Sequence, residues 1–167
     1  MGTTKSGRYL NTEGSETKVS DFALVHAIEG AFTRSLTRDK GKAVFKLRLS
    51  KGGHGQKNIE LLEKYGIEYH IIKTYPNGVR IGNVPRHMHK AKKKETGQSW
   101  FPESWTENDI RRAGEYVAGL KGNHHVADKD SVFGVYKGVR VGVKRTFGKI
   151  ATIFPDSDQS AVIKEEE

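Results

Sequence analysis

The chain has 167 residues, no cysteine and a formal net charge of +9 at neutral pH. A chain of this length is expected to form one domain with a modest extension, and it can bury a core without disulfides. The missing cysteines exclude disulfides, thiolate zinc sites and cysteine nucleophiles. The positive charge makes nucleic acid the leading class of partner, ahead of an anionic membrane surface. No apolar run approaches the length of a membrane span, so we expect no membrane partner.

The N-terminal third of the chain gives the weakest structural signals. Residues 1–20 are polar and rich in Gly, Ser and Thr, which is typical of a loosely ordered arm. Apolar patches at residues 22–25 and 44–49 predict either short strands or a docking segment. A clear helix is expected over residues 56–65, because apolar side chains recur at helical spacing and Gly66 is a favourable C-cap.

A hairpin and a second helix are predicted next along the chain. The turn sequence Pro76-Asn77-Gly78 lies between apolar stretches over residues 67–75 and 79–84, which predicts two antiparallel strands. Thr106 is a favourable N-cap and acidic residues follow it, so a helix is expected over about residues 106–120.

Three strands are predicted near the C-terminus, over residues 131–136, 139–146 and 149–154, with glycine-containing turns between them. In the middle strand, valines alternate with Arg140 and Lys144, which places the cations on one face. The order of helix, hairpin, helix and three-stranded meander predicts an α+β domain with a small antiparallel sheet and packed helices.

One histidine, His54, lies in the glycine-rich segment Lys51-Gly52-Gly53-His54-Gly55-Gln56. Glycines leave the backbone free of side-chain bulk, so a large ligand is able to approach closely. Cleavage of a phosphodiester through the neighbouring 2′-hydroxyl needs a base, an acid and a cation that stabilises the phosphate charge. Imidazole transfers protons near neutral pH, which makes His54 the leading catalytic candidate. The alternative is a histidine that only fills a helix-entry loop.

A dense basic run follows the hairpin, with five Lys or Arg among the nine residues from Arg86 to Lys94. Such a run favours contact with a phosphate backbone. His87 lies within it and is the candidate for the second proton transfer, although a solvated positive loop is the alternative. Lys92 and Lys93 are expected to bind substrate.

Further substrate contacts are expected from the predicted strands. Arg80, Arg140 and Lys144 alternate with apolar neighbours, so they hold ordered positions from which they can bind phosphates. Thr152 is able to donate a hydrogen bond to a phosphate, and Phe154 is able to stack on a base. Plain core packing is the alternative for Phe154.

The sequence predicts no metal site and no cofactor. It lacks a His-Glu-x-x-His motif, a cysteine pair and an Asp-x-Asp loop. A divalent metal ion is expected only if the substrate is DNA, because a water molecule would then have to be activated.

Five motifs follow one another between about residues 48 and 156. They are Gly52-Gly53-His54-Gly55-Gln56, residues 75–84, residues 96–102, residues 138–143 and Thr152-Ile153-Phe154-Pro155. In this order they resemble the bacterial EndoU-type nuclease domain found at the C-termini of polymorphic toxins.

The resemblance implies a small α+β fold related to ribonuclease A and to other toxin nucleases. It also implies RNA cleavage by two histidines and a lysine, leaving a 2′,3′-cyclic phosphate. Such domains are C-terminal parts of larger toxins, of the LXG or contact-dependent-inhibition type, that are secreted and delivered into the cytoplasm of a target cell. The producing bacterium is protected by a tightly binding cognate immunity protein, which we expect to be acidic.

The resemblance also suggests how the chain is divided. Residues 1–47 are interpreted as an N-terminal extension or linker to a larger toxin, residues 48–156 as the nuclease domain, and residues 157–167 as an acidic tail.

Site residues are carried over from the family by position. His54 matches the glycine-framed histidine, and Thr152 and Phe154 match the terminal threonine and aromatic residue. For the second histidine, His70 has a family-like separation from His54, whereas His87 lies in the better-placed loop and is the one we assign. The catalytic lysine stays open between the basic run and Lys144.

The sequence therefore favours a toxin endoribonuclease, a hydrolase of bacterial competition. In this interpretation His54 and His87 act as base and acid, and Thr152 helps to stabilise the phosphorane. Two alternatives stay open: a toxin DNase with a metal-activated water, and a non-catalytic nucleic-acid-binding domain, which would bind in a salt-sensitive way without cleavage.

Overall fold

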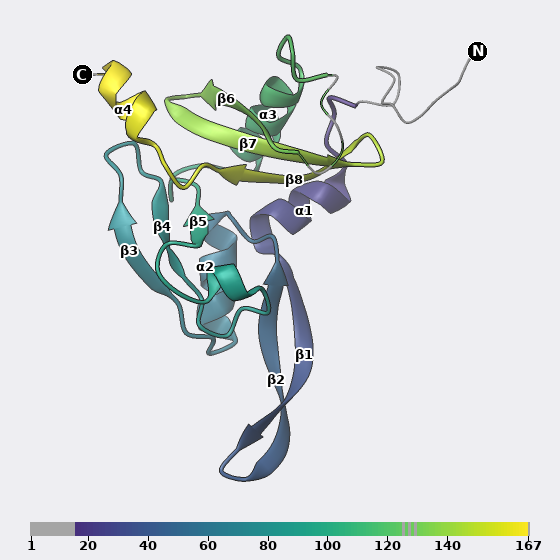
Figure 1. Ribbon diagram of the computed structural model, residues 1–167, viewed down its shortest axis with the longest axis vertical. Coiled ribbons are helices and arrows are strands. Elements are labelled where there is room, and N and C mark those ends of the chain that lie inside the picture. The colour runs from purple at the N-terminus through teal and green to yellow at the C-terminus, as the bar shows by residue number, and fades with distance from the viewer. Residues whose placement is uncertain (1–15, 125, 127, 129, 167) are drawn as a thin grey trace.

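The computed structural model describes residues 16–166 apart from 125, 127 and 129. Small antiparallel sheets and helices alternate along this part of the chain (Figure 1). The α-helices are α1 (Asp21–Glu29), α2 (Gln56–Lys64), α3 (Glu107–Ala118) and α4 (Ser160–Glu166). The strands are β1 (Ala31–Asp39), β2 (Lys42–Lys51), β3 (His70–Thr74), β4 (Arg80–Asn83), β5 (Gln98–Trp100), β6 (Val132–Tyr136), β7 (Val139–Thr146) and β8 (Lys149–Pro155). The predicted α+β class is confirmed.

Side-chain caps mark the starts of α1 and α3. The Ser20 side chain accepts a hydrogen bond from the Ala23 N–H at the start of α1, and Gly30 follows its last residue with a φ of 87°. At the start of α3, Thr106 and Asp109 form a reciprocal capping box. The helices expected over residues 56–65 and 106–120 are present as α2 and α3.

The strands form three antiparallel sheets in the described part of the chain, with the orders β1-β2, β3-β4-β5 and β6-β7-β8. Three hairpins turn on an X-Gly pair in which both residues have positive φ, as type I′ turns require. The pairs are Lys40-Gly41, Lys137-Gly138 and Phe147-Gly148. The predicted hairpin and the three C-terminal strands are confirmed, with bounds shifted by at most three residues.

Two hydrophobic clusters hold these elements together. The first joins α1 and α3 to the inner face of β6-β7-β8, where Val141, Val143 and Ile153 are fully buried. The second joins α2, β5 and the base of β1-β2, and it contains Leu49, Ile59, Leu62, Ile67, Val84 and Trp100. Figure 1 shows the first cluster's sheet above and the second cluster's elements below it.

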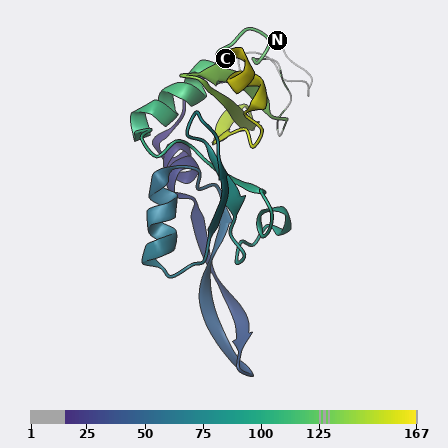
Figure 2. The same ribbon diagram turned by 90° about the vertical axis from the view of Figure 1, so that its left-hand side faces the viewer.

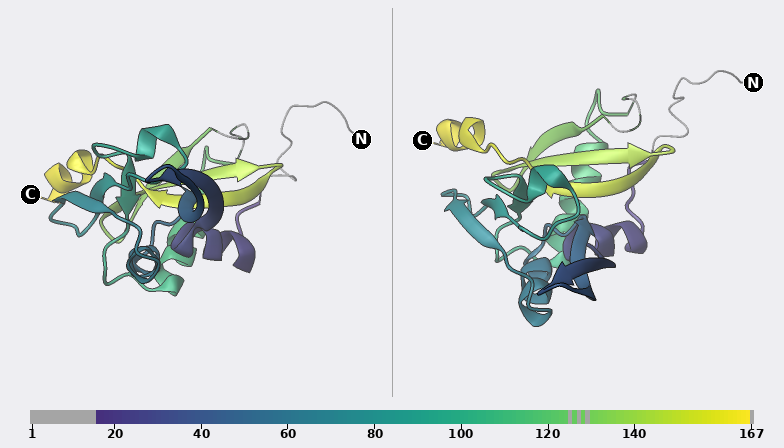
Figure 3. Two further views of the ribbon diagram at one scale, coloured as in Figure 1. Left: turned by 90° about the horizontal axis from the view of Figure 1, so that it is seen from below. Right: turned by 60° about the horizontal axis from the view of Figure 1, so that its bottom comes forward.

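The β1-β2 hairpin extends well beyond both clusters. In Figure 1 and in the perpendicular view of Figure 2 it projects from the body as a twisted ribbon. Seen from below in Figure 3, it points toward the viewer beside α1 and α2. We call residues 31–51 the β-arm.

The structure differs from the predicted boundary at residue 47. Val19, Ala23, Leu24, Ala27 and Ile28 are buried in the first cluster, so α1 and the segment before it belong to the domain. Residues 1–15 of the expected extension lie outside the described residues.

The expected tail also differs in part. Gln159 and Val162 are buried, at 0% and 4% exposure, and α4 begins between them. Gln159 and Val162 therefore anchor this segment to the body, although residues 157, 158, 160 and 161 are exposed.

Candidate active site

A groove of about 950 Å³ lies between α1 with the loops that pack beside it and the strands β7 and β8. One wall is formed by α1, the glycine loop around His54 and the basic loop before β5; we call it the histidine wall. The other wall is the outer face of β7 and β8, and we call it the strand wall. The groove residues used below are His26, Lys51, His54, His89, Lys92, Ser99, Lys144, Thr152, Phe154 and Asp156.

The glycine loop is held on the C-terminal end of α1 by backbone hydrogen bonds. The N–H groups of Gly53, His54 and Gly55 donate to the carbonyl oxygens of His26, Ala27 and Ile28, at 3.1, 2.6 and 3.1 Å respectively. The last turn of a helix leaves carbonyls without partners inside the helix, and the loop supplies donors to those of Ala27 and Ile28. The His26 carbonyl accepts from Gly53 in addition to the Gly30 N–H. The backbone of His54 is consequently fixed directly beside that of His26.

The glycines of the loop are required by this packing. Gly52 and Gly53 have φ values of +69° and +81°. A Cβ at Gly52 would lie 2.3 Å from the His26 carbonyl oxygen, and one at Gly53 would lie 2.4 Å from the side-chain nitrogen of Asn58. Protein atoms therefore fill the Cβ direction of both glycines, although Gly52 also lines the groove.

His54 is held from a second direction by β5. Its Nδ1 lies 2.7 Å from the Ser99 carbonyl oxygen. Because a carbonyl only accepts, Nδ1 carries the hydrogen, and in the neutral ring Nε2 keeps a free electron pair. Burial, reinforced by the positive charge of Lys92, lowers the pKa of His54 from 6.5 to about 3. His54 is therefore a neutral groove-lining base at physiological pH.

His26 is the second histidine of the histidine wall. It projects from the last turn of α1 and lines the same groove as His54. Burial and then the charge of Lys51 lower the pKa of His26, and the two histidines are close enough that His26 contributes to the lowered pKa of His54. The groove thus brings together two imidazoles from segments 28 residues apart.

Lys92 completes the histidine wall from the basic loop. Its Nζ lies 3.4 Å from the Gln98 side-chain oxygen, and the Gln98 amide donates to the Gly53 carbonyl at 2.8 Å. Gln98 is fully buried, so it links the lysine to the glycine loop. Burial, with a contribution from Lys144, lowers the pKa of Lys92 to about 8, so the ammonium is charged at pH 7.

The strand wall presents three side chains at regular spacing. Lys144 of β7 pairs with Thr152 of β8, and Phe154 lies two residues further along the same face. The centroid of the Phe154 ring lies 6.0 Å from the centroid of the His54 ring. It lies over Gly142, where a Cβ would approach the ring to 2.4 Å.

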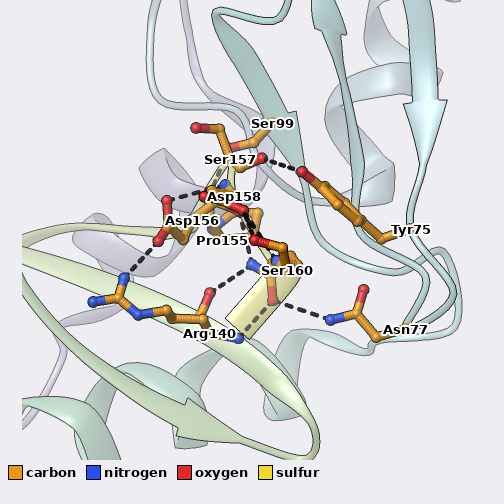
Figure 4. A network of polar contacts seen from close by, with 10 residues as sticks. Tyr75, Asn77, Ser99, Arg140, Pro155, Asp156, Ser157, Asp158 and Ser160 are labelled. Atoms are coloured by element: carbon orange, nitrogen blue, oxygen red, sulfur yellow. Dashed lines mark hydrogen bonds and ion pairs between the residues drawn. The ribbon is translucent and has the colours of Figure 1, made fainter. Parts of the chain in front are cut away.

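A polar network fixes the end of β8 against the other half of the molecule (Figure 4). The Ser99 hydroxyl donates to the Pro155 carbonyl at 2.9 Å, and the Tyr75 hydroxyl donates to the Ser157 carbonyl at 3.0 Å. Ser99 also accepts from His54, so one buried serine joins the two walls. The buried Gln159 side chain connects this segment to β7 through the Arg140 N–H and carbonyl.

Comparison with known proteins identifies the family to which this chain belongs. The chain matches the family described as bacterial EndoU nuclease over residues 26–157, which is most of its length. It belongs to the bacterial EndoU nuclease family. Comparisons with curated proteins and with solved structures gave no significant match. The protein is therefore a bacterial EndoU-type nuclease domain, and the matched region begins at His26 itself.

The EndoU groove gathers some of the residues predicted from sequence. His54, Lys92, Lys144, Thr152 and Phe154 all line it.

Other predicted residues lie elsewhere in the EndoU fold. Arg80 is 8% exposed, and its guanidinium donates to the Gln56 side-chain oxygen and to the Phe101 carbonyl. Arg140 pairs with Asp156 and lies 4.1 Å from the centroid of the Phe133 ring. Neither arginine lines the groove, and neither does Lys93.

The structure does not bring His87 to the groove. Its side chain is fully buried, and its Nδ1 accepts a hydrogen bond from the His89 N–H at 2.8 Å. Burial and Lys92 lower its pKa to about 4, and its Nε2 has no partner among the described residues. His70, the other candidate, is exposed beside Glu68 on β3.

Sequence reasoning missed His26, Gln98 and the positioning role of Ser99. His26 carried a readable signal, because Ser20 and Gly30 bracket Asp21–Glu29 as a helix start and stop. Gln98 carried none, since its role depends on a hydrogen bond to the Gly53 carbonyl, 45 residues earlier in the chain, made while it also accepts from Lys92.

Two findings bear on other partners of the EndoU domain. Among the described residues, no group of three or more His, Asp or Glu is placed to hold a metal ion. None of the described helices is long and apolar enough to cross a membrane.

Proposed function

We propose that this EndoU domain is an endoribonuclease that cleaves RNA through attack of the 2′-hydroxyl. The observation that supports this most is the joint placement of His26 and His54 in one groove with Lys92. Two imidazoles and a cation supply the base, the acid and the charge stabilisation that this reaction needs.

His54 is the base of the proposed reaction. Its Nε2 accepts the proton of the 2′-hydroxyl, and the new bond joins the 2′-oxygen to phosphorus. The hydrogen bond from Nδ1 to the Ser99 carbonyl holds the ring in the required tautomer and stabilises the imidazolium that forms.

His26 takes the place of His87 as the acid. It gives its proton to the 5′-oxygen as the bond from phosphorus to that oxygen breaks, which leaves a 2′,3′-cyclic phosphate. The negative charge of the bound phosphate raises the pKa of a nearby histidine, so occupancy of the groove favours the protonated form of His26.

The remaining groove residues bind and position the strand. The Lys92 ammonium neutralises charge on the phosphorane, with the Thr152 hydroxyl donating from the opposite wall. Lys144 attracts a flanking phosphate, and Phe154 stacks on a base. We propose no cofactor.

We further propose that the domain is the C-terminal part of a larger secreted bacterial toxin that acts in the cytoplasm of a target cell. The family membership and the net charge of +9 support this proposal. An acidic immunity protein would bind the basic groove rapidly through complementary charge.

The experiment that tests the proposal is incubation of the purified protein with RNA and with DNA, each with and without EDTA. We expect cleavage of RNA in both conditions and no cleavage of DNA. Cleavage of DNA that EDTA abolishes would instead support a metal-dependent DNase, and binding without cleavage would support a nucleic-acid-binding domain. The His54→Gln variant is the control for contaminating nucleases.

A further inference from the structure

The β-arm carries most of the net charge of the protein. Residues 31–51 include seven Lys or Arg and one Asp, so they hold +6 of the chain's +9. Within the described part of the chain, Lys46 is the only arm cation with a carboxylate within ion-pair distance, Asp39 at 3.7 Å. Such an excess of unpaired cations on a projecting element favours an anionic partner.

One face of the β-arm combines these cations with exposed apolar side chains. The register places Leu36 opposite Phe45 and Arg34 opposite Leu47, so all four share a face. Leu36 and Phe45 are 63% and 62% exposed, and the Arg34 guanidinium lies 5.2 Å from the Phe45 ring centroid. Arg38 continues the same face toward the tip.

Protection of strand edges explains only part of this pattern. Both strands of a two-stranded hairpin are edges, and charged side chains discourage their pairing with other chains. Edge protection accounts for the lysines and arginines, but it does not account for an exposed phenylalanine and leucine at the centre of the face. An aromatic ring flanked by guanidinium groups is the surface on which proteins stack single-stranded bases.

The β-arm is also continuous with the groove. Ala31 and Lys51, the two residues at its base, both line the groove. Leu36 is five residues from Ala31, which is about 17 Å along a strand. A single strand that leaves the groove past Lys51 therefore meets the arm within a few nucleotides.

We propose that the β-arm is a second binding site for the nucleic-acid strand held in the groove, in which Phe45 stacks on a base and Arg34 and Arg38 contact flanking phosphates. This inference rests on the proposed function, because its occupant is the same single strand. It adds a contact away from the cut, so long substrates bind more tightly than short ones.

The test compares an arm variant with a matched control variant in the full chain. The arm variant is Arg38→Ser with Phe45→Ala. The control is Arg112→Ser with Tyr116→Ala on α3, which likewise removes one exposed arginine and one aromatic residue that is 49% exposed. Thermal melts establish that both variants are folded.

Binding is measured by fluorescence anisotropy in EDTA with labelled oligodeoxynucleotides, which lack the 2′-hydroxyl. For a probe of about twenty nucleotides, we expect the arm variant to bind about tenfold more weakly than the wild type, and the control to bind like the wild type. For a tetranucleotide, all three proteins should bind alike. The readout needs no cleavage, so it stands whether or not the ribonuclease proposal holds.

Two results would overturn the proposal. Equal binding of the long probe by the arm variant and the wild type would show that the arm does not bind the strand. An equal loss on the tetranucleotide would show that the substitutions act through the groove. Single variants separate the contributions, because added salt should diminish the effect of Arg38→Ser and leave that of Phe45→Ala nearly unchanged.

Discussion

The two walls of the groove are built by different means. The histidine wall holds its side chains through long-range backbone hydrogen bonds, and it lowers the pKa of His54 to about 3 and that of Lys92 to about 8. The strand wall presents Lys144, Thr152 and Phe154 by simple strand alternation. This difference matches the division of labour that we propose, in which the histidine wall performs the proton transfers and the strand wall binds the substrate.

Substitution of the two groove histidines should have the largest effect. We expect His54→Gln and His26→Gln each to lower kcat by about 100- to 10,000-fold, because each removes one proton transfer. Single-turnover cleavage of a labelled RNA measures the loss, and thermal melts check the fold.

Two histidines outside the groove are the matched controls. His70→Gln on β3 should leave kcat nearly unchanged, and His87→Gln should lower it by less than about tenfold. The assignment of the second proton transfer would return to His87 if His87→Gln lost most of its kcat at an unchanged melting temperature while His26→Gln lost little.

Lys92 should give the next largest effect, about 100-fold in kcat for Lys92→Ala, because it removes the cation that stabilises the phosphorane. The pH profile tests the role more specifically. The reaction needs His26 and Lys92 protonated, so kcat/KM should fall with rising pH above the lowered pKa of His26, and more steeply above about 8.

Lys92→Arg sharpens this prediction, because a guanidinium stays charged throughout the accessible pH range. The steeper decline above about 8 should disappear in this variant, while the first decline stays. A profile identical to that of the wild type would remove Lys92 from the reaction.

Substitutions on the strand wall should have smaller effects, and these should weaken substrate binding more than they lower kcat. Phe154→Ala should raise KM about tenfold through lost stacking, with a modest change in kcat. Lys144→Ala should reduce the slope of log affinity against log salt by about 0.7, the value for one phosphate contact on a single strand. If Phe154→Ala and Lys144→Ala lowered only kcat and left substrate binding unchanged, the proposed role of the strand wall in binding would be contradicted.

The glycine loop should show its effect mainly in stability. Gly53→Ala places a Cβ 2.4 Å from Asn58 at a φ of +81°, so we expect unfolding to become easier by about 3 kcal/mol. Gly66→Ala is the control, since its φ is +67° but no atom lies within 4 Å. That substitution should cost about 1 kcal/mol, and chemical denaturation measures both.

The contrast between the two walls also explains how much of the fold and the site could be predicted from the sequence. Strand alternation and X-Gly turns are local, and they located β6, β7 and β8, the strands that carry the candidate site residues Thr152 and Phe154. The histidine wall depends on hydrogen bonds between Ala27 and His54, which are far apart in sequence. No local periodicity encodes that contact, so His54 was found from its glycines while His26 was not.

The basic run shows the limit of composition as a guide. It suggested a solvated loop, and Lys92 does line the groove, but His87 from the same run is fully buried. Charge density indicates that a segment lies near phosphate, whereas the burial of each side chain is decided by the packing around it.

The chemistry of the cut ends tests the central claim most directly. RNA cleaved in the presence of EDTA should carry a 2′,3′-cyclic phosphate on the upstream fragment, and a 2′-deoxy substitution at the scissile nucleotide should abolish the cut. A 3′-hydroxyl with a 5′-phosphate, formed only with a divalent ion, would contradict attack by the 2′-hydroxyl and with it the roles of His26 and His54.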